Sequence, residues 1–265
     1  MTARPRLRTL AIAALLSATS DGPASAAGPN STQLLSRPSG VGALPAPGDG
    51  PSFVGRRSVS SDGRMIVFSS SADDLGVGDT LSHIWVRDTI ADTTQLVDRE
   101  PGGGAPGNDF AANASISRDG STVCFESSAT NLVPGVSGNH VFVVKLATGA
   151  VQVADRSSGA PSAVGDADAE RCALDATGGR VVFDSSATNL DLVTADTNAV
   201  TDVFVRILGT GTTTRVSLGP GNAETAEGGS EGTISGDGLK VAFTTRAALI
   251  GGIGGDTNNS DDVTS

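Results

Sequence analysis

The chain has 265 residues and a formal net charge of −11 at pH 7. Phosphate backbones and anionic lipid heads repel an acidic chain, so the charge argues against nucleic-acid and membrane-surface partners. The longest apolar run, Leu10 to Ala18, is about half of the roughly 20 residues that a membrane span needs, which argues against a membrane anchor.

The first residues have the pattern of an export signal. Arg4, Arg6 and Arg8 form a basic start, Leu10 to Ala18 an apolar stretch, and Ala24-Ser25-Ala26 a small-residue cleavage site. Residues 1–26 are therefore predicted to be a removable signal peptide. Cleavage removes three arginines and one aspartate, which leaves a mature chain, 27–265, with a net charge of −13 and a secreted or periplasmic location.

The mature chain repeats one pattern four times. A turn of the type Ser-x-Asp-Gly recurs at steps of 57, 58 and 60 residues, at Asp62, Asp119, Thr177 and Asp237. A phenylalanine follows each turn position by six residues, at Phe68, Phe125, Phe183 and Phe243. A second aromatic column follows downstream at Trp85, Phe142 and Phe204. This spacing indicates a repeated structural unit rather than one irregular domain.

Each repeat predicts four short antiparallel strands. Asp-Gly between two β-rich runs is typical of a tight hairpin, and alternating apolar positions fit strands packed on both faces. Four such strands per repeat are typical of a propeller blade, which buries its faces only against neighbouring blades. We therefore predict an all-β propeller, with the four phenylalanines buried on second strands and blades at about 52–100, 109–156, 168–218 and 228–265.

The repeat resembles the WD40-like, TolB-type β-propeller repeats of exported bacterial proteins. The best copy is Ser186-Ala187-Thr188-Asn189-Leu190, followed by Asp196-Thr197-Asn198 and Asp202-Val203-Phe204-Val205. The resemblance runs from about Gln33 to the end of the chain and implies the fold. It does not imply one function, because such propellers serve as scaffolds, as binding modules and as parts of enzymes.

The two ends of the repeat region predict an incomplete ring. Residues 32–37 match the fourth-strand column, although no blade precedes them, and such a strand commonly completes the last blade of a propeller. The fourth repeat stops within its third strand, where Thr264 takes the place of the aromatic column. We expect that further blades are missing; the alternative is a self-closed ring of four.

The histidines and aromatic residues favour structural roles. His83 and His140 occupy the same column of the repeat, whereas catalytic residues are usually unique in a repeat array. No histidine-rich metal spacing is present. The Phe68 and Trp85 columns are predicted core. Phe53 and Phe110, taken as a third column, either approach the central channel or, as we expect, pack in the core.

Two loops have the spacing of a calcium site. Asp196-x-Asn198-x-x-x-Asp202 recurs as Asp256-x-Asn258-x-x-x-Asp262, and oxygen ligands at alternate loop positions suit Ca²⁺. The Asp196 loop is also four residues longer than its counterparts in repeats one and two. The alternative is that these side chains only form turns and cap strands. We predict calcium binding at Asp196, Asn198 and Asp202, with Asp256, Asn258 and Asp262 as the weaker set.

Two cysteines add one further expectation. Cys124 lies on the second strand of blade two and Cys172 near the inner strand of blade three, so neighbouring blades could bring them together. A disulfide persists in an exported protein, but sequence does not fix the required approach of the Cβ atoms.

The sequence predicts function only in outline. The main hypothesis is an exported, non-enzymatic propeller that binds a protein or glycan through its acidic inter-strand loops, with no cofactor except possible Ca²⁺. The alternatives are the propeller portion of a secreted hydrolase, a peptidase or glycoside-active protein whose catalytic domain is absent, and a calcium-stiffened scaffold with no specific ligand.

Overall fold

The computed structural model describes residues 12–14, 32–39, 49–159, 162–247 and 262–264. It is built from short β-strands, with two 3-10 turns at η1 (Asp73–Leu75) and η2 (Pro220–Asn222). No helix in the described ranges is long and apolar enough to cross a membrane. The predicted signal cleavage site at Ala24–Ala26 lies outside the described residues.

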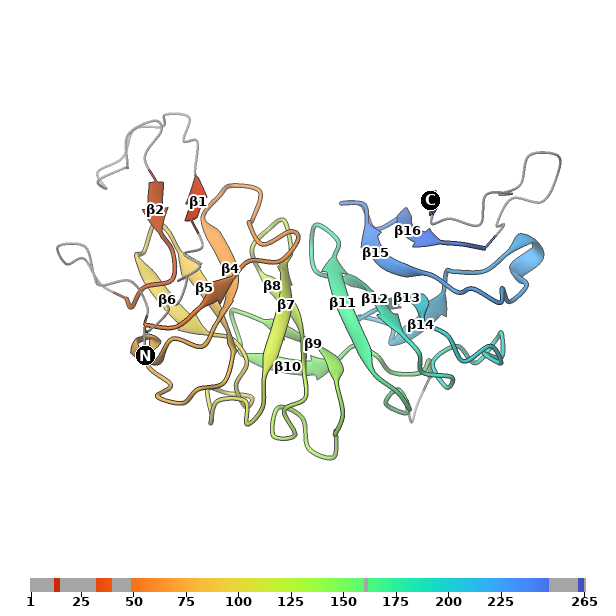
Figure 1. Ribbon diagram of the computed structural model, residues 1–265, viewed down its shortest axis with the longest axis horizontal. Helices are drawn as coiled ribbons and strands as arrows, with labels where there is room; N and C mark the ends of the chain where they lie inside the picture. Colours follow the sequence, from red (N-terminus) through yellow and green to blue (C-terminus); the bar gives the residue numbers. More distant parts are fainter. Residues whose placement is uncertain (1–11, 15–31, 40–48, 160–161, 248–261, 265) are drawn as a thin grey trace, which may run out of the picture.

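Four antiparallel sheets follow one another in chain order, from left to right in Figure 1. Blade 1 contains β3 (Ser52–Phe53), β4 (Met65–Ser70), β5 (His83–Asp88) and β6 (Thr93–Leu96). Blade 2 contains β7 (Ala111–Ile116), β8 (Thr122–Ser127), β9 (His140–Lys145) and β10 (Ala150–Val153). Blade 3 contains β11 (Ala169–Leu174), β12 (Arg180–Ser185), β13 (Asp202–Ile207) and β14 (Thr212–Arg215). Blade 4 contains β15 (Ser230–Ile234), β16 (Val241–Thr245) and β17 (Asp262–Thr264).

The strand register confirms the predicted repeat. The second and third strands pair so that the two aromatic columns meet, at Phe68–Trp85, Phe125–Phe142 and Phe183–Phe204. In blade 4 the same register pairs Phe243 with Thr264. All four second-strand phenylalanines are buried. The chain is therefore an all-β protein made of propeller blades, as predicted.

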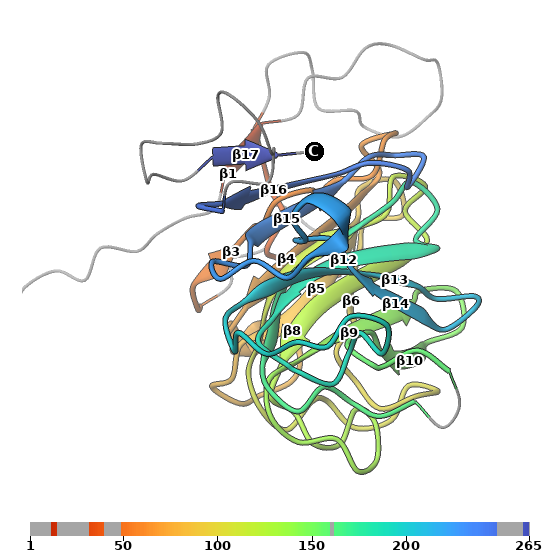
Figure 2. The same cartoon turned by 90° about the vertical axis from the view of Figure 1, so that its right-hand side faces the viewer.

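Apolar side chains hold each blade against the next. Three clusters of buried residues lie between successive blades, centred on Phe125 and Phe142, on Phe183 and Phe204, and on Phe243. Figure 2 shows β15 and β16 of blade 4 stacked over blade 3. Each blade therefore buries its faces between its neighbours, as a repeat array requires.

The turns that precede the second strands lie side by side at one end of the molecule. Backbone N–H groups join them from blade to blade: Ser61 donates to Arg118, Asp119 to Ala176, and Ala176 to Gly236. Gly63, Gly120, Gly178 and Gly238 have positive φ in these turns, which is why glycine recurs there. The predicted hairpins are thus confirmed, and they also link neighbouring blades.

The N-terminal segment packs on blade 1 as the end of a fourth strand does. The carbonyl of Arg37 accepts a bond from Thr94 Oγ1, and Ser39 Oγ bonds both backbone groups of Thr94. Arg156 and Ser158, which follow the fourth strand of blade 2, contact Thr213 of blade 3 in the same way. This parallel supports the interpretation of residues 32–37 as a fourth-strand segment.

The partner of that segment differs from the expectation. β2 (Thr32–Leu34) pairs antiparallel with β1 (Ile12–Ala14), and not with a last blade among the described strands. β1 lies inside the predicted signal peptide. Cleavage after Ala26 would remove β1 and leave β2 with a free edge.

The core assignment of Phe53 and Phe110 was wrong. Their side chains are exposed, at 57% and 39%. They are also not equivalent positions: Phe53 pairs with Ser69 in blade 1, and the matching pair in blade 2 is Ala112 with Glu126. The inner strand of blade 1 contains extra residues after Phe53, so counting back from the turn misaligned the two phenylalanines.

Candidate functional site at the axis and in the blade 3 loop

The inner strands of blades 2, 3 and 4 each contain a β-bulge at the same place. The register shifts between Ala112 and Ser115, between Glu170 and Ala173, and between Ser230 and Thr233. The first bulged residue has a left-handed backbone in every case, at Asn113, Arg171 and Glu231, and Arg57 of blade 1 shares this conformation. Their φ angles lie between 51° and 58°. A bulge redirects a side chain out of the alternating pattern, and here it does so in three blades.

Positive φ at a residue other than glycine costs about 1–2 kcal/mol, and asparagine tolerates it best. Asn113, Arg171 and Glu231 have this conformation at the same position of their repeats, and Arg57 has it one residue nearer its turn; all four are exposed. Strain repeated at one place in this way is typical of a functional surface rather than of packing.

Buried carboxylates on the second strands accept hydrogen bonds from the backbone N–H groups of two of the bulges. Glu126 on β8 accepts the backbone N–H of Arg171 and the side-chain amide of Asn113. Asp184 on β12 accepts the backbone N–H groups of Glu231 and Gly232, at 2.6 and 3.2 Å. Burial raises the pKa of Glu126 and raises the pKa of Asp184 to about 6. A carboxylate of one blade therefore sets the bulge of the next.

The redirected side chains surround one cavity of about 230 Å³. Its lining comes from the inner strands or inner segments of all four blades: Gly55, Arg56, Arg57, Asn113, Arg171, Cys172, Ala173, Glu231, Gly232 and Thr233. Arg57 of blade 1 reaches blade 3, where its Nη1 donates to the carbonyl of Leu174 at 3.0 Å. Glu231 of blade 4 lies 3.6 Å from Arg56 and 3.9 Å from Arg171. We call this cavity the axial site.

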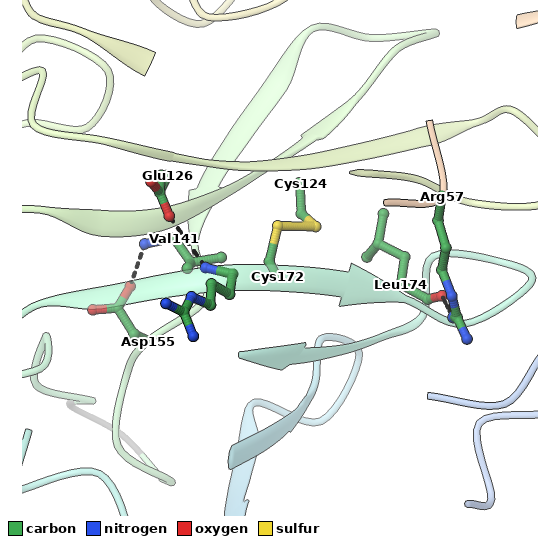
Figure 3. The surroundings of a disulfide bond; sticks show 8 residues. Arg57, Cys124, Glu126, Val141, Asp155, Cys172 and Leu174 are labelled. Carbon is green, nitrogen blue, oxygen red and sulfur yellow. Dashed lines mark hydrogen bonds between the residues drawn. A yellow bond between two sulfur atoms is a disulfide. The ribbon is translucent and has the colours of Figure 1, made fainter. Parts of the chain in front are cut away.

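The disulfide that the sequence left open forms beside the axial site. Cys124 on β8 and Cys172 on β11 are bonded, and their Cα atoms are 6.2 Å apart. Figure 3 shows the disulfide between Glu126 on one side and Arg57 with Leu174 on the other. Because Cys172 follows Arg171 in the bulge, the covalent link holds the bulge of blade 3 against blade 2.

Both histidines are buried in the blades, away from the axial site. His83 Nδ1 lies 2.7 Å from Asp98 Oδ2, and the other oxygen of Asp98 accepts the N–H of Ile84. His140 makes the same pair with Asp155, whose second oxygen accepts the N–H of Val141. We call this contact, between the first residue of the third strand and a residue 15 positions later, the strand-end pair. Both histidines thus lie in buried hydrogen-bonded pairs, as a structural role requires.

In blade 3 the strand-end pair is built differently. Asp202 takes the place of histidine and accepts a bond from Ser217 Oγ at 2.5 Å, while Ser217 Oγ accepts the N–H of Val203. The guanidinium of Arg215, whose side chain is 0% exposed, lies within 3.3 Å of three carboxylates, those of Asp196, Asp202 and Glu224. Its Nη2 also donates to the carbonyl oxygens of Thr194 and Ala195.

Two of the three predicted calcium ligands, Asp196 and Asp202, meet at Nη1 of Arg215, and Asn198 is bonded elsewhere. Asp202 is occupied by Arg215 and Ser217, and Asn198 donates to the Thr225 carbonyl and accepts the N–H of Val200. Asp196 is buried with no hydrogen-bond donor on either oxygen, and burial raises its pKa. In the described part of the chain, no three acidic, histidine or cysteine side chains are placed to hold a metal. As arranged here these residues do not fit Ca²⁺, because Arg215 is the cation at their centre.

The second predicted set lies almost wholly outside the described residues. Asp256 and Asn258 are not described, and Asp262 is described only as the first residue of β17. Calcium binding at either loop stays a prediction.

Sequence reasoning missed the axial residues because bulges have no motif of their own. One signal was available: the residue after the repeated phenylalanine is acidic only in blades 2 and 3, at Glu126 and Asp184. A carboxylate at a position flanked by buried residues requires donors, and backbone N–H groups of an adjacent bulge are the donors that the fold supplies.

No family model and no curated protein matches the chain. Solved structures similar to it include TolB from Acinetobacter baumannii, with 16% identity, a TM-score of 0.45, and coverage of 81% of this chain and 40% of that one. Putative TolB from Agrobacterium tumefaciens has 16% identity, a TM-score of 0.47, and coverage of 84% and 62%. The β-propeller domain of the Trilobed protease from Pyrococcus furiosus has 8% identity, a TM-score of 0.43, and coverage of 81% and 57%. The chain thus spans less than two thirds of each of these structures, and the likeness concerns the fold alone.

Proposed function

We propose that this chain is a non-enzymatic, extracytoplasmic propeller module that binds a ligand at the axial site. One observation carries the proposal: Arg57, Asn113, Arg171 and Glu231, which lie five or six residues before the turn positions of the four blades, adopt a left-handed backbone and line the same cavity. The interblade disulfide is consistent with an extracytoplasmic protein. We further propose that the segment 1–26 directs export to the periplasm or the medium.

The axial site supports binding better than the acidic loop of blade 3 does. Arg215 already neutralises much of the charge in that loop, because it lies within 3.3 Å of the carboxylates of Asp196, Asp202 and Glu224. The axial residues are exposed, and their ion pairs at 3.6–3.9 Å are longer than hydrogen bonds. The proposed ligand surface therefore moves from the loops to the axis.

The positions of the histidine side chains support the proposal of a non-enzymatic role. The chain has only two histidines, and both are buried in strand-end pairs with aspartate. The axial site instead contains guanidinium, amide and carboxylate groups, which suit recognition through hydrogen bonds and charge.

A ligand screen tests the proposal. The mature protein is screened against amino acids, short peptides, sugars and organic acids by ligand-observed NMR, beside an axial variant with Arg57→Gly, Arg171→Gly and Glu231→Gly. We expect ligands that bind the unaltered protein, lose binding in the axial variant, and are recovered chemically unchanged. Ligands that depend instead on the Asp196 loop would contradict the axial assignment, and conversion of a bound ligand would favour the alternative of a hydrolase propeller.

A further inference from the structure

The axial site carries an excess of positive charge within an acidic protein. Its lining residues include three arginines, Arg56, Arg57 and Arg171, and one acid, Glu231. Glu170 lies just outside, 3.7 Å from Nε of Arg171. In a chain of net charge −11, three arginines line this one small cavity, while the carboxylates of Glu126 and Asp184 lie behind the bulges.

The guanidinium groups at the axis retain donors that no group among the described residues takes at hydrogen-bond distance. The contacts of Arg56 and Arg171 with Glu231 and Glu170 measure 3.6–3.9 Å, and these two arginine side chains are 79% and 47% exposed. Arg57 uses one Nη1 donor on the Leu174 carbonyl. Burial, followed by repulsion from Arg118, lowers the pKa of Arg57, so a negative charge beside it would be stabilising.

The nearby buried acids do not take these donors. The oxygens of Glu126 and Asp184 accept backbone N–H groups of Arg171, Glu231 and Gly232, and the side-chain amide of Asn113. Glu126 and Asp184 therefore act on the backbone of the bulges and leave the guanidinium groups facing the cavity.

We propose that the axial site binds the anionic group of its ligand, a carboxylate or a phosphate, through Arg56, Arg57 and Arg171. The planar fork of a guanidinium matches both groups with two parallel hydrogen bonds. A cavity of about 230 Å³ holds such a group with only a few further atoms, so it receives one end of a larger ligand. The amide of Asn113 and the carboxylate of Glu231 then face the atoms next to the anion. This inference rests on the proposed function, of which it names the ligand class.

The positive φ of Arg57 and Arg171 makes a clean test possible. Glycine accepts this backbone conformation without the steric cost of a Cβ, so Arg57→Gly and Arg171→Gly remove charge without straining the fold. Ala199→Gly is the matched control, because Ala199 has φ of 56° in an exposed loop of blade 3 and carries no charge.

The experiment is calorimetric titration of the folded protein at low salt with inorganic phosphate, with succinate, and with neutral succinamide. We expect phosphate or succinate to bind, and about tenfold weaker binding or more in each arginine variant, since a hydrogen bond to a charged group is worth more than one factor of ten. The melting temperature should stay level or rise in both variants, and Ala199→Gly should bind as the unaltered protein does. Whichever anion binds more tightly identifies the group.

Two results would overturn the proposal: neither anion binds, or binding survives in the Arg57→Gly, Arg171→Gly double variant. If succinamide or sugars bind at the axial site while both anions fail, the proposed function stands and the anion inference falls. If no class of ligand depends on the axial residues, both fall together.

Discussion

Blades 1 and 3 solve the same structural problem with opposite charges. In blade 1 the third strand begins with His83, which pairs with Asp98 just after the fourth strand. In blade 3 the third strand begins with Asp202, an acid, which pairs with the hydroxyl of Ser217 just after the fourth strand. In both, the closing side chain also accepts the N–H of the next third-strand residue, Ile84 or Val203. The repeat therefore preserves a buried hydrogen-bonded pair, not a residue type.

The reversal in blade 3 creates a charge that the blade must neutralise. Arg215 pairs with Phe204 across β13 and β14, where blade 1 has Leu96 opposite Trp85 and blade 2 has Val153 opposite Phe142. The position that is apolar in blades 1 and 2 is therefore a buried arginine in blade 3, where the strand-end pair contains Asp202 in place of histidine. The longer acidic loop with Asp196 then surrounds that arginine.

The largest effect is expected when Arg215 is replaced by the residue of blade 1. Arg215→Leu leaves Asp202 and Asp196 buried without a counterion, which costs about 3–5 kcal/mol and lowers the melting temperature by roughly 10 °C. Urea unfolding measures the loss. Arg99→Leu is the control: Arg99 bonds only the Gly104 carbonyl among the contacts resolved here, and its loss should be small. Equal losses in both variants would contradict the role given to Arg215.

The same variant sharpens the calcium prediction. If Arg215 acts as the internal cation, millimolar Ca²⁺ should raise the melting temperature of Arg215→Leu, where three carboxylates lack a counterion, and not that of the unaltered chain. Melts with Ca²⁺ and with chelator are compared. A calcium shift in the unaltered chain that disappears with Asp196→Ala plus Asp202→Ala would place the ion in the predicted loop despite Arg215.

The sequence predicted the blades better than it predicted the site, for a physical reason. Blade packing depends on local periodicity, which is visible in the sequence because Phe68, Phe125, Phe183 and Phe243 recur at nearly constant spacing. The axial site depends on bulges, which have no motif of their own. Asn113, Arg171 and Glu231 lie six residues before their turn positions and Arg57 lies five before, but this spacing alone does not indicate a left-handed backbone. The cation in the Asp196 loop was missed because Arg215 lies on another strand, and only the fold brings the two together.

A smaller effect is expected from the hydroxyl of Ser217. Ser217→Ala removes the donor to Asp202 and the acceptor for the buried N–H of Val203, and the unsatisfied groups should cost about 1–3 kcal/mol. Thr210→Ala, at an exposed turn of the same blade, should change stability by less than about 0.5 kcal/mol. Chemical unfolding distinguishes them, and a loss in Ser217→Ala no greater than in the control would mean that water replaces the hydroxyl.

The smallest expected effect is a pH dependence that blades 1 and 2 have and blade 3 lacks. His140 Nε2 lies 3.0 Å from the Ser137 carbonyl, which can only accept, and its Nδ1 faces the Asp155 carboxyl, so this geometry fits an imidazolium. His83 is in the same state between Asp98 and Asp79. Burial pulls the pKa of each histidine down, but the hydrogen bonds and charges of the aspartates outweigh it, so both pKa values are raised.

A raised pKa in the folded state sets the sign of that dependence. The stability from each imidazolium is fully present below about pH 6.5, the value of an unfolded histidine, and is lost as the pH rises through the higher folded value. The free energy of unfolding should therefore fall between pH 6 and pH 9. His140→Gln, whose amide can donate to Asp155 without titrating, should reduce this slope, and His83→Gln with His140→Gln should nearly remove it. Arg99→Leu, which changes no titrating group in this range, should keep the full slope. A slope unchanged in the double histidine variant would show that the pairs fold as neutral imidazole with protonated aspartate, which would erase the charge reversal between blades 1 and 3.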